Sequence, residues 1–190
     1  SVIGDRRPNP SVAERNAAVA AAIELEADTA ARAAKRRIST AGELKDYLEW
    51  RFSARAGELL VVDPYLLADK QEEVVKRVIE FLLHLRRPVR ALTAKASPAG
   101  LAVLESIEVS GLQIRGLPNG RATVHDRPWL VGETGVLTGA SLNTFLKEES
   151  PASTAVDLPF ADAAAWREKF EKWWAAGRRF SETPENSLAP

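Results

Sequence analysis

One segment of the sequence combines side chains that could act on a phosphate group. His125 and Arg127 are two residues apart on an expected strand, so their side chains should lie on the same face. The Gly139-Ala-Ser-Leu-Asn143 turn that follows offers backbone N–H groups, a hydroxyl and an amide. A cation neutralises phosphate charge, the donors hold its oxygens, and an imidazole can attack phosphorus or transfer a proton. The segment predicts phosphate chemistry; the alternative from spacing alone is a half-buried histidine beside an arginine paired with Asp126 or Glu133.

The composition excludes several other kinds of site. The chain of 190 residues has no cysteine and only two histidines, His84 and His125. Disulfides, thiol nucleophiles, zinc–thiolate sites and histidine-rich metal sites are therefore excluded, and we expect neither a metal nor another cofactor. His84, near the end of an amphipathic helix, is more typical of a surface or packed histidine than of a ligand. The lack of cysteine favours an intracellular setting, and we expect a cytoplasmic protein.

The charge is balanced overall but unevenly spread. The chain has 26 basic and 26 acidic residues, and 45% of it is hydrophobic, as in an ordinary globular protein. Residues 81–125 contain six basic and two acidic side chains, whereas residues 126–190 contain seven basic and ten acidic ones. The basic stretch predicts an anionic partner. No apolar run approaches the roughly 18 residues that span a bilayer, so we expect no membrane partner.

The elements expected around the phosphate segment alternate between strands and helices. Continuous apolar runs predict buried strands, and apolar residues at helical spacing predict helices, the first of which starts at a capping box in 40–43. This alternation indicates an α/β protein whose mixed sheet is covered by helices. The expected strands are 58–62, 89–93, 112–115, 121–131, 135–138 and 156–158, and the expected helices are 40–52, 71–85, 97–107 and 161–180.

The chain is predicted to form one domain with an extra segment at each end. Residues 1–10 are expected to be a loose lead-in, and an alanine-rich helix should run from 11 to 37 and end in a cluster of cations. Its thin apolar face fits a capping helix or a contact with a second subunit. The start at Ser1 and the lack of methionine fit a fragment or a processed N-terminus. The division is an arm at 1–38, a domain at 39–180 and a disordered tail at 181–190.

The last expected helix carries a stripe of large aromatic side chains. Its members recur at helical spacing, which predicts a face packed on the core, and the alternative is an exposed platform on which nucleic-acid bases stack. The Arg178-Arg179 pair after this stripe is predicted to lie at the C-terminus of the helix, where cations are favourable. The stripe consists of Trp166, Phe170, Trp173 and Trp174.

Taken together, the His125-Asp-Arg127 triplet and the Gly139–Asn143 turn resemble the signature of the phospholipase D superfamily. That signature is His-x-Lys, four residues, Asp, and about six residues later a Gly-Ser/Ala…Asn turn. Upstream, Leu59–Tyr65 resembles the strand and Asp-Pro-Tyr turn of the family's relatives, and Val89–Thr93 resembles their next strand. The likeness extends over residues 44–180, in the order of one half of a two-motif enzyme. It implies a phospholipase D-like sandwich with a mixed central sheet and helices on both faces.

The resemblance also implies a chemistry. His125 takes the place of the family histidine, which acts as a nucleophile or as an acid and base, and Arg127 stands in the lysine position. The family uses two motifs, a phosphohistidine intermediate and no metal, so catalysis would need a homodimer that brings two copies of His125 together. The implied phosphate contacts are Gly139, Ser141 and Asn143, and the candidates for supporting contacts are Asp63, Tyr65 and Glu133, although Asp-Pro-Tyr is equally typical of a plain turn.

The segment departs from the family signature in three ways. Arg127 can bind phosphate bidentately but cannot place a compact ammonium as lysine does. Gly132 occupies the aspartate position, with Glu133 one step along and on the opposite face. Pro128 removes a backbone donor from the strand, which predicts a bulge or an edge strand. These departures affect turnover more than phosphate binding.

Three functions remain open. The one we favour is a domain that binds a phosphodiester, above all nucleic acid, at His125 and Arg127, with degenerate or weak catalysis. The second is an active metal-independent nuclease or phosphodiesterase that works as a homodimer through a phosphohistidine at His125. The third is a non-catalytic interaction domain of a larger assembly, which by resemblance would be a DNA-processing or phage-defence system. A phospholipid substrate fits less well, because no strongly amphipathic, basic helix is present to lie on a membrane.

Overall fold

The structure is a computed structural model that describes residues 11–17, 19, 35–106, 111–118, 125–147 and 152–180. The chain divides into a unit of residues 1–34 and a unit of residues 35–190. In the first unit, residues 12–17 and 19 are helical, as expected. The expected lead-in, the rest of the alanine-rich helix before residue 35, and the tail at 181–190 lie outside the described residues.

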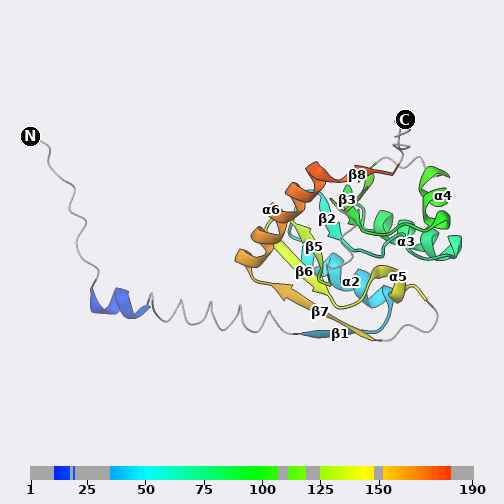
Figure 1. The fold of residues 1–190 in the computed structure, drawn as a ribbon. Helices are drawn as coiled ribbons and strands as arrows, with labels where there is room; N and C mark the ends of the chain where they lie inside the picture. Colours follow the sequence, from blue (N-terminus) through cyan, green and yellow to red (C-terminus); the bar gives the residue numbers. More distant parts are fainter. Residues whose placement is uncertain are drawn as a thin grey trace, which may run out of the picture. The chain divides into compact units, whose positions relative to one another are not determined.

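The second unit is built on one mixed sheet of eight strands (Figure 1). Their order is β1-β7-β6-β5-β2-β3-β4-β8; β2, β3 and β4 are parallel, and the other neighbouring pairs are antiparallel. The strands are β1 (Arg36–Ile38), β2 (Leu59–Val62), β3 (Val89–Thr93), β4 (Leu112–Gly116), β5 (Arg127–Val131), β6 (Thr134–Thr138), β7 (Ser153–Leu158) and β8 (Arg178–Arg179). The helices are α2 (Ala41–Phe52), α3 (Glu72–His84), α4 (Pro98–Ser106), α5 (Leu142–Phe145) and α6 (Phe160–Ala176).

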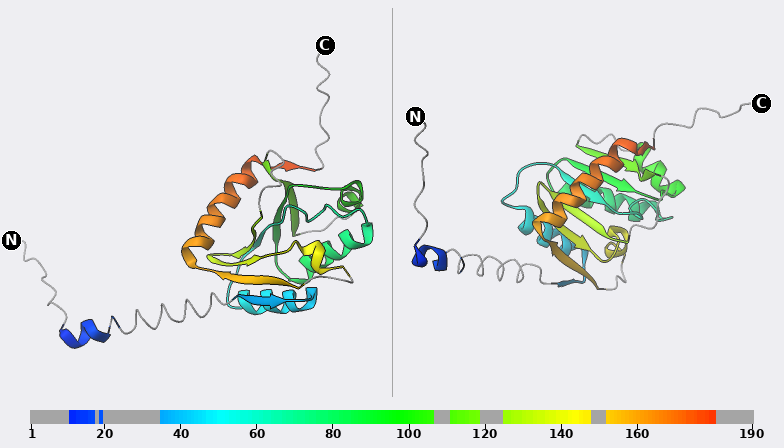
Figure 2. Two further views of the ribbon diagram at one scale, coloured as in Figure 1. Left: turned by 60° about the horizontal axis from the view of Figure 1, so that its bottom comes forward. Right: turned by 60° about the vertical axis from the view of Figure 1, so that its left-hand side comes forward.

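Helices cover both faces of the sheet, which confirms the expected sandwich (Figure 2). Successive residues of β2 point to opposite faces. Leu59 and Val61 join the core beneath α2, α3, α4 and α5, whereas Leu60 and Val62 join the core beneath α6. All four of these side chains are fully buried, because β2 lies in the middle of the sheet with a helical layer on each side.

The sequence signals for α2 and α3 are confirmed. Thr40 caps α2 by accepting a hydrogen bond from the Glu43 amide at 3.1 Å, and the Glu43 carboxylate accepts one from the Ser39 amide at 2.6 Å. A capping box has the same two bonds, except that its carboxylate accepts from the capping residue itself rather than from the residue before it. The apolar face of α3 is buried, and His84 lies exposed near its end. No helix in the described parts of the chain is long and apolar enough to cross a membrane.

The ends of the first and last expected helices were wrong. Arg36–Ile38 forms β1 and pairs with β7, although the alanine-rich helix was expected to reach residue 37. The last helix ends at Ala176 rather than at 180, and Arg178–Arg179 forms β8, which pairs with β4. Both segments satisfy backbone groups of a neighbouring strand, which a longer helix would leave unpaired.

An ion-pair cluster attaches α6 to the sheet. Arg90 on β3 donates four hydrogen bonds of 2.7–3.0 Å, two to Glu58 and two to Glu171 on α6. Its guanidinium carbon lies 5.4 Å and 5.2 Å from the ring centroids of Phe170 and Trp174. These hydrogen bonds raise the pKa of Arg90 and lower the pKa of Glu171. Arg90 therefore anchors α6 to the sheet through Glu171 and through the rings of Phe170 and Trp174.

The aromatic stripe on α6 only partly forms the core. Phe170 and Trp174 are buried, at 0% and 8% exposure, and their rings stack with centroids 5.7 Å apart. Trp166 and Trp173 are half-buried at the border of the core, and the Lys169 ammonium lies 4.6 Å and 4.7 Å from their rings. The prediction that the stripe packs on the core is therefore confirmed for Phe170 and Trp174.

Candidate phosphodiester site

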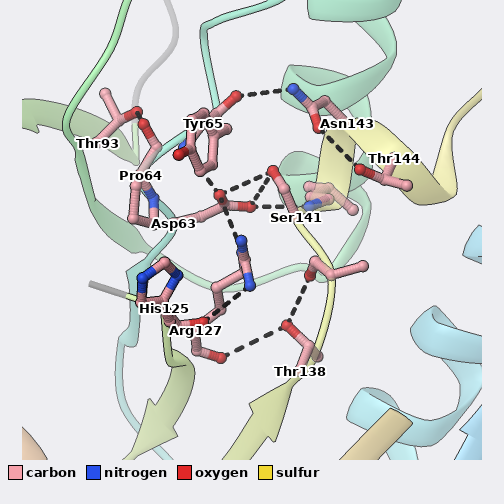
Figure 3. Close-up of polar contacts among 12 residues, drawn as sticks. Asp63, Pro64, Tyr65, Thr93, His125, Arg127, Thr138, Ser141, Asn143 and Thr144 are labelled. Atoms are coloured by element: carbon pink, nitrogen blue, oxygen red, sulfur yellow. Dashed lines mark hydrogen bonds and ion pairs between the residues drawn. The ribbon is translucent and has the colours of Figure 1, made fainter. Parts of the chain in front are cut away.

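The candidate residues gather at the edge where the parallel strands β2 and β3 end (Figure 3). Asp63 follows β2, Arg127 opens the antiparallel neighbour β5, and Ser141 follows β6. Three segments distant in the sequence therefore meet at one edge. The carboxyl ends of parallel strands are where α/β proteins usually bind ligands.

Asp63 lies at the centre of this edge. Its side chain is 1% exposed, and it accepts hydrogen bonds from the Ser141 hydroxyl (2.8 Å), the Leu142 amide (2.8 Å) and the Tyr65 amide (3.0 Å). Burial raises the pKa of Asp63, while these three donors and the Arg127 guanidinium act in the opposite direction. The carboxylate thus joins the end of β2 to the turn between β6 and α5.

Arg127 is held mainly by the protein itself. Its Nη1 donates to the carbonyl oxygens of His125 (2.9 Å) and Gly139 (3.0 Å), and its Nε lies 3.9 Å from Asp63 Oδ1. The side chain is 12% exposed, and the buried Nε makes no hydrogen bond to any described residue. Much of the positive charge of Arg127, the residue in the lysine position, therefore balances the negative charge of the Asp63 carboxylate.

Lys95 is a basic residue of this edge that the sequence analysis missed. It follows β3, its side chain is exposed, and its Nζ lies 5.3 Å from the centroid of the Tyr65 ring. The Arg127 guanidinium carbon lies 6.0 Å from the same centroid. Among the described residues Lys95 has no ion-pair partner. Its position two residues after an expected strand was a signal, because parallel strands end at one edge.

His125 is the exposed part of the site. It immediately precedes Asp126 and β5, and its side chain faces solvent, whereas its carbonyl accepts the hydrogen bond from Arg127. Among the described residues its imidazole has no hydrogen-bond partner. The imidazole is therefore available to a ligand or to another chain.

The expected phosphate donors have partners within the fold. The Ser141 hydroxyl donates to Asp63, and the Asn143 side-chain amide donates to the Tyr65 carbonyl at 2.8 Å. Gly139 contributes its carbonyl to Arg127. Their contact with phosphate stays a prediction, whereas the structure shows them fastening the turn after β6 to the end of β2. Within the described parts of the chain, no three carboxylate or imidazole side chains are grouped as metal ligands would be.

The other motif positions lie elsewhere or differ from expectation. Glu133 is exposed in the turn between β5 and β6, at the far end of β5 from Arg127, so the structure does not bring it to the site. Pro128 lies in an internal strand without a bulge, paired with Leu137, so the expected edge or bulge was wrong. The pairing of β5 with β2 stops at Trp129 and does not reach Pro128. The N–H group that Pro128 lacks is therefore not needed on that side.

Gly132 has a structural reason to replace the aspartate of the family signature. Its φ is +57°, and nothing lies within 4 Å of the position that a Cβ would occupy. Gly132→Asp is therefore expected to lower the free energy of unfolding by about 1 kcal/mol through backbone strain alone. It should not create nuclease activity, because position 132 lies far along β5 from Arg127. Chemical denaturation and a nuclease assay check both expectations.

A glycine in a helix serves as the matched control for this variant. Gly42 lies in α2 with space around its Cβ position, so Gly42→Ala should stabilise the protein by about 0.5–1 kcal/mol. Equal effects of the two substitutions would show that the backbone at position 132 imposes no strain.

No family model and no curated protein matches the chain. Several solved structures do. Nuc, a phospholipase D family member from Salmonella typhimurium, has 14% identity and a TM-score of 0.51; the match covers 77% of this chain and 97% of Nuc. NucT from Helicobacter pylori has 8% identity and a TM-score of 0.50, over 77% and 98% of the two chains.

Phosphatidylserine synthase from Haemophilus influenzae Rd KW20 has 12% identity and a TM-score of 0.53. The match covers 80% of this chain but only 40% of the synthase. Identities this low show the fold alone. The fold around the candidate site is thus phospholipase D-like, as the sequence resemblance implied.

Proposed function

We propose that this domain binds a phosphodiester, and specifically nucleic acid, at the edge formed by His125, Lys95 and Arg127. The observation that supports it best is the pair of cations, Lys95 and Arg127, that lie against the ring of Tyr65. An exposed ammonium and an exposed imidazole can contact a phosphate, and the aromatic ring offers a surface for a neighbouring base.

The same geometry favours binding over turnover. Arg127 is held by two carbonyls and lies near Asp63, so it has little freedom to follow the charge that develops on a reacting phosphate. Ser141 donates to Asp63 rather than outward. One chain also supplies one histidine where the family chemistry needs two. We therefore assign weak or no catalysis to the single chain.

Lys95→Ala tests the binding site directly. It should weaken binding of a fluorescently labelled single-stranded DNA roughly tenfold, a loss of about 1.4 kcal/mol. It should also lower the slope of log Kd against log salt by about one, because one fewer phosphate is neutralised. Fluorescence anisotropy between about 50 and 200 mM salt measures both quantities.

Lys169→Ala is the matched control for this prediction. Lys169 is also exposed and also lies on aromatic rings, but those rings belong to α6, which packs on the face of the sheet that buries Leu60 and Val62. Binding by this variant should equal that of the wild type. Affinity that does not change with salt, or an equal loss in both variants, would contradict the proposed site.

The exposed imidazole supports a second candidate function. A homodimer that brings two copies of His125 together would have one nucleophile and one general acid, and would cleave phosphodiesters without a metal. Light scattering combined with nuclease assays in EDTA tests this candidate, with His125→Ala beside the wild type. Cleavage by a dimer that is lost in the variant supports it, and a monomer without cleavage excludes it. Absence of both DNA binding and cleavage would leave the interaction domain of a larger assembly.

A further inference from the structure

A cavity of about 450 Å³ lies at the opposite end of β2 from the candidate phosphodiester site. It is bounded by α2, by the first residue of β2 and by the residues that follow α3. Its floor includes Phe52 and Leu59, which are 2% and 1% exposed. The cavity is therefore a solvent-open hollow over a closed apolar core.

Basic side chains dominate the wall of this cavity. Lys45, Arg86 and Arg87 contribute three positive charges. Among the described lining residues the only acidic one is Glu49, whose carboxylate lies 3.6 Å from the Lys45 ammonium. The wall thus has a net charge of about +2, and the two arginines have no carboxylate partner among the described residues.

Arg86 and Arg87 belong to the basic stretch of residues 81–125, whose other cations within the described part of the chain lie elsewhere. Arg90 is held by two glutamates, and Arg115 donates to the Trp174 carbonyl at 2.7 Å with its guanidinium over the Trp174 ring. Lys95 lies at the other edge of the sheet. Part of the excess positive charge of the stretch therefore lies at this cavity, apart from the candidate phosphodiester site.

The backbone of Arg86 adds an independent observation. Its φ is +53°, and it is the only residue other than glycine with a positive φ in the described parts of the chain. Arg86 follows Leu85, the C-cap of α3, at a position where glycine is strongly preferred. Cations near a helix C-terminus are favourable, and Arg87 supplies one to the carbonyls of Phe52 and Arg55 at the end of α2. The Arg86 amide donates to the Leu83 carbonyl at 3.1 Å, so this backbone conformation ends α3. Glycine would end the helix in the same way without strain, so it is the presence of an arginine side chain here that points to a function.

Arg87 is partly pre-positioned at the same wall. Its guanidinium nitrogens lie 3.5 Å and 3.4 Å from the carbonyl oxygens of Arg55 and Phe52, and its Cζ lies 6.0 Å from the Phe52 ring. These contacts are long, so they orient the side chain without saturating its donors.

We propose that this cavity binds a phosphate monoester, with Arg86 and Arg87 as the groups that hold the phosphate. Planar guanidinium groups match phosphate oxygens bidentately. A monoester is close to a dianion at neutral pH, which matches the charge of the wall, whereas a diester carries one charge. The volume falls within the range of small-molecule sites, so the ligand class is a phosphorylated metabolite up to the size of a nucleotide.

Arg86→Gly tests this assignment without endangering the fold. Glycine relieves the backbone strain, so the variant should melt at or above the temperature of the wild type when no phosphate is present. Inorganic phosphate and a nucleoside 5′-monophosphate should each raise the melting temperature of the wild type, against chloride at equal ionic strength. Calorimetry should show binding at least about tenfold weaker in Arg86→Gly, equivalent to about 1.4 kcal/mol.

Two further variants locate the effect. Arg77→Ala removes an arginine of α3 that pairs with Glu73 outside the cavity, and it should bind phosphate like the wild type. The double variant Lys95→Ala/His125→Ala removes the groups of the other edge and should also retain phosphate binding. Loss of binding in the double variant, equal binding by wild type and Arg86→Gly, or no binding by the wild type would each overturn the proposal.

Discussion

Replacing Asp63 with alanine is expected to lower the free energy of unfolding by about 3–5 kcal/mol. The carboxylate is 1% exposed, and it accepts hydrogen bonds from the Ser141 hydroxyl and from the amides of Tyr65 and Leu142. Without the carboxylate these donors stay buried without an acceptor, and the Arg127 guanidinium loses a nearby negative charge. Chemical denaturation followed by tryptophan fluorescence measures the loss.

Two related variants separate this role from a general effect of charge. Asp126→Ala removes an exposed carboxylate directly before β5, and it should change stability by less than about 0.5 kcal/mol. Asp63→Asn keeps the shape and one carbonyl acceptor, so its stability should lie between those of the wild type and the alanine variant. An Asp63→Ala protein with the unfolding curve of the wild type would show that the network does not stabilise the fold.

Arg90→Ala is expected to cost about 2–3 kcal/mol of stability. The side chain is 17% exposed, and its loss breaks four hydrogen bonds to Glu58 and Glu171. It also removes the cation from the rings of Phe170 and Trp174. Because those rings hold α6 on the sheet, α6 should loosen first in this variant. The fluorescence of the α6 tryptophans should therefore change before the main unfolding transition.

Acidification gives a second measurement of the same cluster. The ordinary pKa of Glu171 is 4.5, and its hydrogen bonds from Arg90 lower that pKa in the folded protein. Folding therefore favours the ionised carboxylate. The resulting stability is present above pH 4.5 and is lost as the pH falls through the lower pKa of the folded state. Arg90→Ala should consequently lose less of its remaining stability on acidification than the wild type does.

Arg90→Lys is the conservative control. Lysine keeps the charge but cannot make paired hydrogen bonds to two carboxylates at once, so its stability should be intermediate. The idea of a bidentate anchor would fail if Arg90→Lys matched the wild type, or if acid affected the wild type and Arg90→Ala equally.

The central elements could be predicted from the sequence because burial leaves a local pattern. Val61 and its neighbours in β2 form a continuous apolar run, since both faces of that strand are covered. The buried face of α3 likewise appears as helical spacing. β1 and β8 left no such pattern, because each has two or three residues and depends on a partner distant in the sequence. Arg37 pairs with Thr154, and Arg179 pairs with Arg115.

For the site, the sequence indicated which residues meet but not how they bond. Asp63 and Ser141 were both candidates, yet their mutual hydrogen bond joins positions 78 residues apart and depends on the antiparallel placement of β5 and β6. Ser141 was expected to contact phosphate because its hydroxyl was counted as free. Lys95 was missed because it belongs to no motif; only the parallel pairing of β2 with β3 brings it near Tyr65.

The short outer strands also bear on how two copies of this chain could meet. The sheet ends in β1 on one side and β8 on the other, and both begin with exposed arginines. Very short, cationic outer strands discourage a sheet from adding strands of a neighbouring molecule, which is the usual route to uncontrolled aggregation. A self-association of this protein is therefore expected to be finite and to use surfaces other than the two outer strands, rather than to extend its sheet without limit.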